Sequence, residues 1–445
     1  MRHRLTAHRG IPRVADTLRP PYALRMFPRL TSYTQNVQLR RSIWSLALVA
    51  LAAPLLWGCG VGDEPKSVDA SLAASNAGSD TEGSQFPTLD DFWNGDAEFQ
   101  VDAADTGLPM GESDTVVLSD GRYRAYVHAS DRSLGVVDSC GAPVEFPGCL
   151  VAFESANQGR SFEPVHDETG QVTCMIPCRT CPCDSRRDHV DQQQYPRVIQ
   201  YMAGDASEST AWLLVYEYRG SVFLRSSDDG LGWSDAAQVP QTGTWRTWLM
   251  PCRSEESIGP HPYAASEFDC LVGGPPGLAM EDDGGLSRLF VFVGLGQNPG
   301  SMGCYRGLLG TQAALLRKCE NNPLFTGAST YGEGSGAAAS EFFDFRTISS
   351  ADVIQVSNRY YMFYEGVRGP DEGAAGDTQF ALGLARSLTR EIDGPWETYA
   401  HNPILVDLPG NVGVGHADVV VDHGETILFT SLDGESRSRL TLRWK

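Results

Sequence analysis

The chain has 445 residues, a formal net charge of −21, and 41% hydrophobic against 20% charged residues. Residues 1–58 hold nine Arg and only one acid, so the net charge of the remaining chain is more negative than that of the whole chain. A surface with that much negative charge repels phosphate backbones, which excludes nucleic acid as a partner. The 47 Gly and 26 Pro favour many short strands joined by turns over a helical protein.

The N-terminal segment predicts export. Residues 43–57 form an uninterrupted apolar run behind Arg40 and Arg41, too short for an ordinary membrane span and typical of a signal peptide. The run ends Leu-Leu-Trp-Gly-Cys at Cys59, which resembles the lipobox of bacterial lipoproteins. That resemblance implies lipidation of Cys59, removal of residues 1–58, and anchoring in the outer or cytoplasmic membrane. An ordinary signal peptide or an N-terminal anchor is the alternative.

Residues 59–85 are rich in Ala, Ser, Gly and Asp and lack apolar periodicity. This composition predicts a flexible tether. We expect residues 86–445 to form the folded domain.

Cysteine usage agrees with export. The chain has 11 Cys, and setting aside Cys59 leaves an even number, which predicts disulfides in an oxidising compartment. Pairs close in sequence are the expected ones: Cys140–Cys149, Cys252–Cys270 and Cys304–Cys319. The cluster of Cys174, Cys178, Cys181 and Cys183 leaves zinc binding open as an alternative.

A unit of about 65 to 80 residues recurs along the folded part, as in repeat architectures. Each unit starts with a short apolar strand and continues with a strand rich in aromatic or β-branched residues. The first strands are expected at 114–118, 196–199, 276–280, 350–356 and 416–421. The second strands are expected at 123–127, 212–217, 288–293, 360–366 and 426–429. Unit four also shows a third strand at 380–386 and a fourth that opens at Pro395.

Two turns carry a sharper pattern. Residues 226–233, SSDDGLGW, resemble the Asp-box of sialidases and related propellers, and residues 155–162 are a looser copy at the same place in their unit. In such a turn, Asp or Asn caps backbone N–H groups, Gly takes a positive φ, and the aromatic residue is buried. The motif is structural rather than catalytic, and two copies in register indicate a β-propeller.

Units four and five resemble the five-bladed propellers of glycoside hydrolase family 43 and its relatives in families 32 and 68. The resemblance rests on Tyr361–Gly366, on Ala385–Ser387 through Trp396, and on the Asn-Pro links at 322–323 and 402–403, and it spans roughly residues 110–445. It implies an all-β fold: a five-bladed β-propeller of four-stranded antiparallel blades around a central channel.

In such blades the first strand starts, and the second ends, at one face of the channel. We therefore expect catalytic carboxylates there from Asp114, Asp352, Glu365 and Glu217, since sugar hydrolysis uses two carboxyl groups. Substrate-binding residues are expected to be Arg197, Arg346, His416, Asp418 and His128, and Tyr360 or Trp245 would stack on sugar rings. The resemblance implies a general base at Asp114 and a channel His at His416.

The chain departs from the family pattern in two units. Unit two offers Arg197 where an acid is expected, and unit three lacks an acid at the end of its second strand, although Glu281 or Glu341 could substitute from nearby loops. The three family acids therefore do not transfer residue by residue.

These observations predict an extracytoplasmic, lipid-anchored glycoside hydrolase-like protein that acts on oligo- or polysaccharides as a monomer. A non-catalytic carbohydrate-binding or scaffold propeller is the alternative. A sialidase-like enzyme is a third reading, which would need Arg197, Arg346 and Arg368 to converge on a substrate carboxylate. No cofactor is expected, apart from a structural calcium or other cation that the resemblance allows in the channel.

Overall fold

A computed structural model divides the chain into two compact units, Met1–Asp69 and Ala70–Lys445. The first lies wholly outside the described residues, as do Cys59 and the apolar run before it. The described residues are 85–128, 134–144, 149–178, 181, 193–202, 210–218, 221–234, 275–283, 286–296, 301–309, 316–327, 343–344, 347–368, 379–406, 414, 416–432, 434 and 436–445. Within these ranges no helix is both long and apolar enough to cross a membrane.

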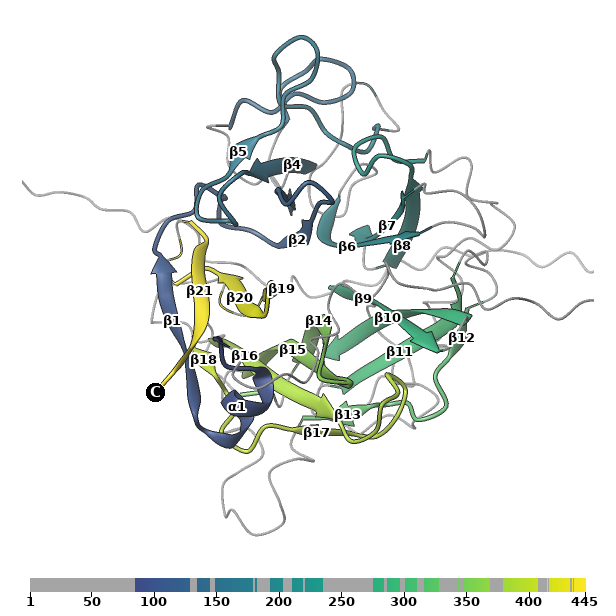
Figure 1. Cartoon of the computed structure of the whole chain (residues 1–445). Helices are drawn as coiled ribbons and strands as arrows, with labels where there is room; N and C mark the ends of the chain where they lie inside the picture. Colours follow the sequence, from purple (N-terminus) through teal and green to yellow (C-terminus); the bar gives the residue numbers. More distant parts are fainter. Residues whose placement is uncertain are drawn as a thin grey trace, which may run out of the picture. The chain divides into compact units, whose positions relative to one another are not determined.

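The second unit is a five-bladed β-propeller, which confirms the predicted fold class (Figure 1). Blade 1 holds β2 (Ser113–Val117), β3 (Tyr123–His128), β4 (Leu150–Ser155) and β5 (Glu163–Pro164). The described part of blade 2 holds β6 (Gln194–Met202), β7 (Thr210–Tyr218) and β8 (Ser221–Ser227). Blade 3 holds β9 (Pro276–Asp283), β10 (Leu286–Gly296), β11 (Ser301–Leu308), β12 (Arg317–Lys318) and β13 (Phe325–Thr326).

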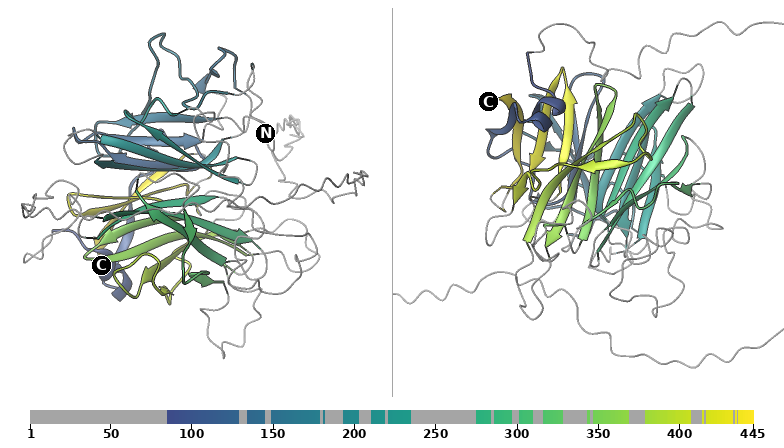
Figure 2. Two further views of the ribbon diagram at one scale, coloured as in Figure 1. Left: turned by 90° about the vertical axis from the view of Figure 1, so that its right-hand side faces the viewer. Right: turned by 90° about the horizontal axis from the view of Figure 1, so that it is seen from below.

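Blade 4 holds β14 (Thr347–Val356), β15 (Arg359–Arg368), β16 (Gln379–Ser387), β17 (Trp396–Thr398) and β18 (Leu405–Val406). Blade 5 holds β19 (Asp418–Asp422), β20 (Glu425–Thr430), β21 (Ser438–Trp444) and β1 (Ala97–Ala103). Each expected first and second strand overlaps a strand of the structure. The side views show the strands of successive blades stacked face to face (Figure 2).

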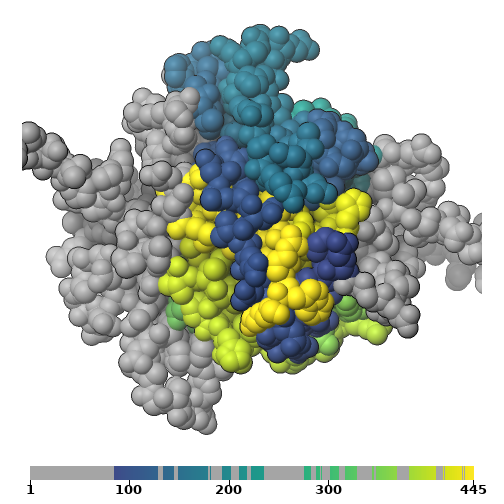
Figure 3. All heavy atoms as spheres, turned by 60° about the vertical axis from the view of Figure 1, so that its left-hand side comes forward, coloured from purple at the N-terminus to yellow at the C-terminus, as the bar shows by residue number. Residues whose placement is uncertain are grey.

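The ring is closed by the N-terminal strand. β1 pairs antiparallel with β21, with Ala97 opposite Trp444, so residues from both ends of the domain share blade 5. Figure 3 shows these two segments side by side on one face of the molecule. The fully buried Arg439 pairs with Asp102 of β1 and with Glu425 of β20. The repeat pattern did not predict this closing strand. A short helix, α1 (Leu89–Asn94), precedes it behind a Thr88 capping box.

The two Asp-box-like turns have matching hydrogen bonds. Ser155 Oγ accepts from Gly159 N at 2.9 Å, and Ser227 Oγ accepts from Gly230 N at 2.9 Å. Asp229 Oδ1 adds bonds from the amides of Leu231 and Gly232, 2.8 Å each. These bonds satisfy the turn amides locally, which frees the following aromatic residue to pack inward.

The aromatic residue of each turn packs on the preceding blade. The ring of Phe162 in blade 1 meets Phe429 of blade 5 edge-on, with centroids 5.7 Å apart, and Trp233 in blade 2 meets Tyr126 of blade 1 at 5.9 Å. The hydrophobic core therefore lies between blades, in the sheet-on-sheet manner of propellers.

Three disulfides are described, and two of them correct the sequence analysis. Cys304–Cys319 is confirmed. Cys140 pairs with Cys181, and Cys149 with Cys174, so the expected Cys140–Cys149 pair is wrong. Because Cys178 is disulfide-bonded as well, the alternative of a zinc cluster is also wrong. The two pairs of blade 1 join the β3–β4 and β5–β6 connections, which lie close in space but far apart in sequence. Cys252 and Cys270 lie outside the described residues.

Candidate functional site

The first strand of each blade begins where the second strand ends. Ser349 at the start of β14 faces Glu365 at the end of β15, and Gln194 of β6 faces Glu217 of β7 in the same way. In blade 1, His128 N donates to Glu112 O. We call this end of the channel the mouth. The convergence expected from blade geometry therefore holds for these side chains.

The deepest layer, here the hub, consists of Asp114, Arg197, Asp352 and Asp418, all at least nine-tenths buried. Each aspartate accepts the backbone N–H of the neighbouring blade's first strand: Val198 N to Asp114 at 2.5 Å, Val419 N to Asp352 at 2.6 Å, and Thr115 N to Asp418 at 2.9 Å. The hub carboxylates thus tie blades 1 and 2, 4 and 5, and 5 and 1 to each other.

Burial raises the pKa of Asp114 well above its ordinary value despite the opposing attraction of Arg197. Burial likewise raises the pKa of Asp352 to about 6. A raised carboxyl pKa is a property of general acids, but it also follows from packing like charges in a dry hub.

The second group, at the mouth, is a chain of alternating imidazoles and carboxylates. His128 Nδ1 lies 3.0 Å from Glu112 Oε2. The other oxygen of Glu112 lies 3.6 Å from His416 Nε2, and His416 Nδ1 lies 3.1 Å from Glu365 Oε2. Ser349 Oγ donates to the second oxygen of Glu365 at 2.9 Å. We call these five residues the relay.

The relay contains Glu112, which the sequence analysis did not identify. Burial alone would raise the pKa of Glu112, but the combined attraction of His416 and His128 outweighs it and lowers the pKa to about 2. Burial lowers the pKa of His416, whereas Glu365 and Glu112 raise it, and the net shift is upward. Glu112 is therefore a carboxylate across the physiological range.

Two relay atoms are buried without a hydrogen-bond partner among the described residues: His128 Nε2 and His416 Nε2. Unsatisfied buried polar atoms are rare in folded proteins and are a feature of ligand and catalytic sites. Their convergence at the mouth makes the relay the candidate site.

Two equivalent bulges shape the floor of the site. The register of β6 shifts between Gln194 and Arg197, and that of β14 shifts between Ser349 and Asp352. Within them Tyr195 has φ 55° and Ser350 has φ 51°, a left-handed backbone unusual for these residue types. The Tyr195 ring stacks on His416 with centroids 5.1 Å apart. Bulges commonly re-aim side chains beside functional sites.

The other expected residues fall in different places. Glu217 lies at the mouth end of β7, in the position that Glu365 occupies in β15. Tyr360 is buried in the core at the opposite end of β15, so its expected stacking on sugar is wrong. Arg346, Glu341 and Trp245 lie outside the described residues.

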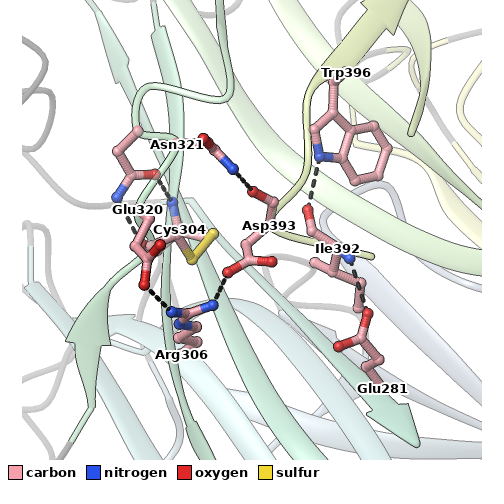
Figure 4. The surroundings of a disulfide bond; sticks show 10 residues. Glu281, Cys304, Arg306, Glu320, Asn321, Ile392, Asp393 and Trp396 are labelled. Atoms are coloured by element: carbon pink, nitrogen blue, oxygen red, sulfur yellow. Dashed lines mark hydrogen bonds and ion pairs between the residues drawn. A yellow bond between two sulfur atoms is a disulfide. The ribbon is translucent and has the colours of Figure 1, made fainter. Parts of the chain in front are cut away.

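Glu281 does not replace a missing mouth acid. It lies at the far end of β9, where it accepts from Ile392 N at 2.9 Å (Figure 4). It also pairs with Arg288 at 3.1 Å. Arg306 bonds to Asp393 and Glu320 in the same region. These contacts join blades 3 and 4 on the face opposite the mouth.

The described residues around the channel offer few donors that could bind a metal ion. Oxygens of Asp114, Asp352 and Asp418 lie within 4.8 Å of one another and form the one three-donor group found in the described part of the chain. However, the guanidinium of Arg197 reaches into that group, with Nη1 3.2 Å from Asp114 Oδ1. The hub residues therefore do not fit a bound metal ion.

The likeness of this chain to known proteins is distant. No family model matches the chain. No curated protein matches it either. Among solved structures, an endo-arabinase from Bacteroides thetaiotaomicron is similar, with 13% identity, coverage of 78% of this chain and 98% of that one, and a TM-score of 0.43.

An endo-1,4-beta-xylanase from the same bacterium has 14% identity, covers 77% and 92% of the two chains, and gives a TM-score of 0.42. A family 43 endo-arabinanase from Bacillus licheniformis has 13% identity, coverage of 77% and 96%, and a TM-score of 0.37. The resemblance to family 43 stays a prediction.

Proposed function

We propose that this protein is an exported, lipid-anchored glycoside hydrolase-like propeller that acts on glycans at the relay. The observation that carries the proposal is the row of buried histidines and carboxylates at the mouth, in which His128 Nε2 and His416 Nε2 lack a hydrogen-bond partner among the described residues. A sugar presents hydroxyl groups that both donate and accept, so it would satisfy an imidazole nitrogen in either tautomer.

The relay has the chemical parts that glycoside hydrolysis needs. Glu112, kept ionised by its two histidines, suits the carboxylate that activates water or attacks the sugar carbon. Glu365, on the other side of His416, is the candidate for the second carboxyl group, which protonates the leaving oxygen. Ser349 and His416 would hold Glu365 in place. Catalytic roles for Asp114, Asp352 and Glu217 stay predictions.

A non-catalytic glycan-binding propeller is the second candidate, because the same unsatisfied atoms would bind a sugar without cleaving it. The sialidase-like reading has less support. Arg197 already donates to Asp114 and Ser350, while Arg346 and the side chain of Arg368 are not described.

Export and anchoring are part of the proposal. Disulfides in blades 1 and 3 suit an oxidising compartment. Replacing Cys59 by Ser should move the protein from the membrane fraction to the soluble fraction and abolish labelling by a radioactive fatty acid. Labelling that persists in the variant would contradict lipidation at Cys59.

The test of catalysis is sugar release from arabinan, xylan and a panel of aryl glycosides. We expect release by the parent protein, and at least a ~100-fold lower rate in Glu365→Gln and in Glu112→Gln. Glu163→Gln, the same change at an exposed position on β5, is the matched control and should keep full activity. Saturable glycan binding without release by the parent would replace hydrolysis with the binding function. Neither release nor binding on any glycan would refute both.

A further inference from the structure

The hub concentrates negative charge on side chains that are almost fully buried. Asp114 and Asp352 are each 7% exposed, and Asp418 is fully buried. Their oxygens lie within 4.8 Å of one another. Carboxylates this close, in a medium of low dielectric constant, require a cation among them or must take up protons.

Arg197 provides that cation. It is 4% exposed, and its two terminal nitrogens reach opposite sides of the channel. Nη1 contacts Asp114 Oδ1 and Ser113 O, each at 3.2 Å, while Nη2 contacts Ser350 Oγ at 3.1 Å and Ser350 O at 3.4 Å. Burial would lower the pKa of Arg197, but the attraction of Asp352, Asp114 and Asp418 outweighs it.

Arg437 is a second buried guanidinium near the hub, and the charge of Asp418 attracts it. Its described hydrogen bonds go to the backbone oxygens of Gly111, His416 and Phe429. It therefore fastens the strand ends of blades 1 and 5. Arg197 is the hub arginine that contacts an aspartate of the group directly.

Blade 3 has no acid at the position of the hub aspartates. In blades 1, 4 and 5 the hub aspartate pairs across the strands with an aromatic residue: Tyr126, Phe363 and Phe429, respectively. In blade 3 the residue opposite Phe292 is Gly277. A Cβ atom there would lie 2.6 Å from Ala351 O, so blade 4 packs directly against this glycine. The hub therefore combines aspartates from three blades with the arginine of blade 2.

We infer that the guanidinium of Arg197 is the resident cation of the channel, in the place among three carboxylates that a divalent metal ion would otherwise take. The folded propeller then does not depend on a metal ion at its hub. Removal of the guanidinium would leave clustered carboxylate oxygens, the donors that Ca²⁺ prefers, and so create a metal site. This inference holds whether or not the relay hydrolyses glycans.

The test is thermal unfolding of the purified protein in EDTA and in millimolar CaCl₂, with calorimetric titration of Ca²⁺. The parent should unfold at the same temperature in both solutions. Arg197→Ala should unfold at lower temperature in EDTA and regain at least about 3 °C in Ca²⁺, because a ligand that binds only the folded state stabilises it. Arg225→Ala, which removes another buried arginine of blade 2, is the matched control and should gain nothing from Ca²⁺.

Two results would overturn the inference. One is a parent protein that loses stability in EDTA and recovers it with Ca²⁺. The other is a folded Arg197→Ala whose response to Ca²⁺ equals that of Arg225→Ala. If Arg197→Ala does not fold, the parent and Arg197→Lys are compared instead. Arg197→Lys keeps one positive charge, so Ca²⁺ should not change its unfolding temperature. Ca²⁺ binding by Arg197→Lys would refute the inference.

Discussion

His416 lies between two carboxylates and under the ring of Tyr195, so its charge is controlled by groups from three other blades. Glu112 comes from the segment before β2, Glu365 from β15 and Tyr195 from β6. An imidazole held in this way has a fixed orientation, and its protonation is linked to folding.

This linkage predicts a pH window. The lowered pKa of Glu112 contributes stability that is present above the unfolded value of 4.5 and is lost as the pH falls towards about 2. The raised pKa of His416 contributes stability that is present below 6.5 and is lost as the pH rises through the folded value. The melting temperature of the parent should therefore exceed that of Glu112→Gln most between about pH 5 and 6.5. Thermal unfolding at a series of pH values checks this.

Glu163→Gln, exposed on β5, is the control for the pH series and should follow the parent at every pH. A difference between the parent and Glu112→Gln that stays constant from about pH 3 to about pH 9 would mean that the ion pair with His416 does not form.

At this scale the sequence predicts part of the site. The convergence of strand ends predicts that His128, Glu365 and His416 lie at the mouth. Glu112 is absent from that prediction, because the expected first strand starts at Asp114. The period-two alternation of a strand puts Glu112 on the same side as Asp114, so the sequence does contain a signal for it. Tyr195 and Ser350 could not be found, because their positions depend on bulges that only the pairing register reveals.

The turn between the third and fourth strands is the element that holds neighbouring blades together. Its glycine lies against the preceding blade as well as in a left-handed backbone. A Cβ atom on Gly230, which has φ +71°, would lie 2.6 Å from Tyr126 Oη and 2.9 Å from Trp212 Cδ2.

Gly230→Ala should therefore lower the unfolding free energy by more than the strain of the left-handed backbone alone. We expect a loss of about 3 kcal/mol in unfolding free energy, of which about 1 kcal/mol is the left-handed backbone. Gly121→Ala isolates that backbone part, since Gly121 has φ +82° and open space around its Cβ position. Denaturant unfolding of both variants measures the difference. Equal losses would show that the turn does not pack against blade 1 as described.

The disulfides of blade 1 are a second element with a local effect. Cys149–Cys174 lies next to Leu150, whose strand partner is the relay residue His128. Replacing both cysteines by Ala should cost about 2–4 kcal/mol of stability and weaken glycan binding. The same replacement of Cys304–Cys319 in blade 3 should cost a similar amount and leave binding unchanged. Binding isotherms of the two double variants make the comparison. Equal glycan affinities of the two double variants would show that the Cys149–Cys174 disulfide does not affect the position of His128.

At the scale of the whole molecule, the blade count and the strand order inside each unit followed from local patterns of apolar residues and turns. Two features did not. β1 reads AEFQVDA and is mostly exposed, so its apolar pattern is weak and its partner lies at the other end of the chain. The disulfides of blade 1 connect two loops that only the blade brings together. Both are long-range contacts, on which a local pattern carries no information.

Closure of the ring by β1 predicts the result of a truncation. A chain that starts at Asp105 lacks β1 and α1, exposes the edge of β21, and leaves the buried Arg439 without Asp102. We expect it to melt at least about 10 °C lower or to aggregate. A chain that starts at Gln85 retains both elements and should melt like the parent. Equal melting temperatures for the two chains would show that β1 is dispensable.

The shared blade also gives the chain an order of assembly. β1 precedes every other strand in the sequence, and its partner β21 follows all of them. During synthesis blade 5 therefore cannot be completed until β21 has been added, whereas the described strands of blades 1 to 4 are already present by then. Up to that point β1 lacks the strand with which it pairs, so the first strand made is the last to find its place in a sheet.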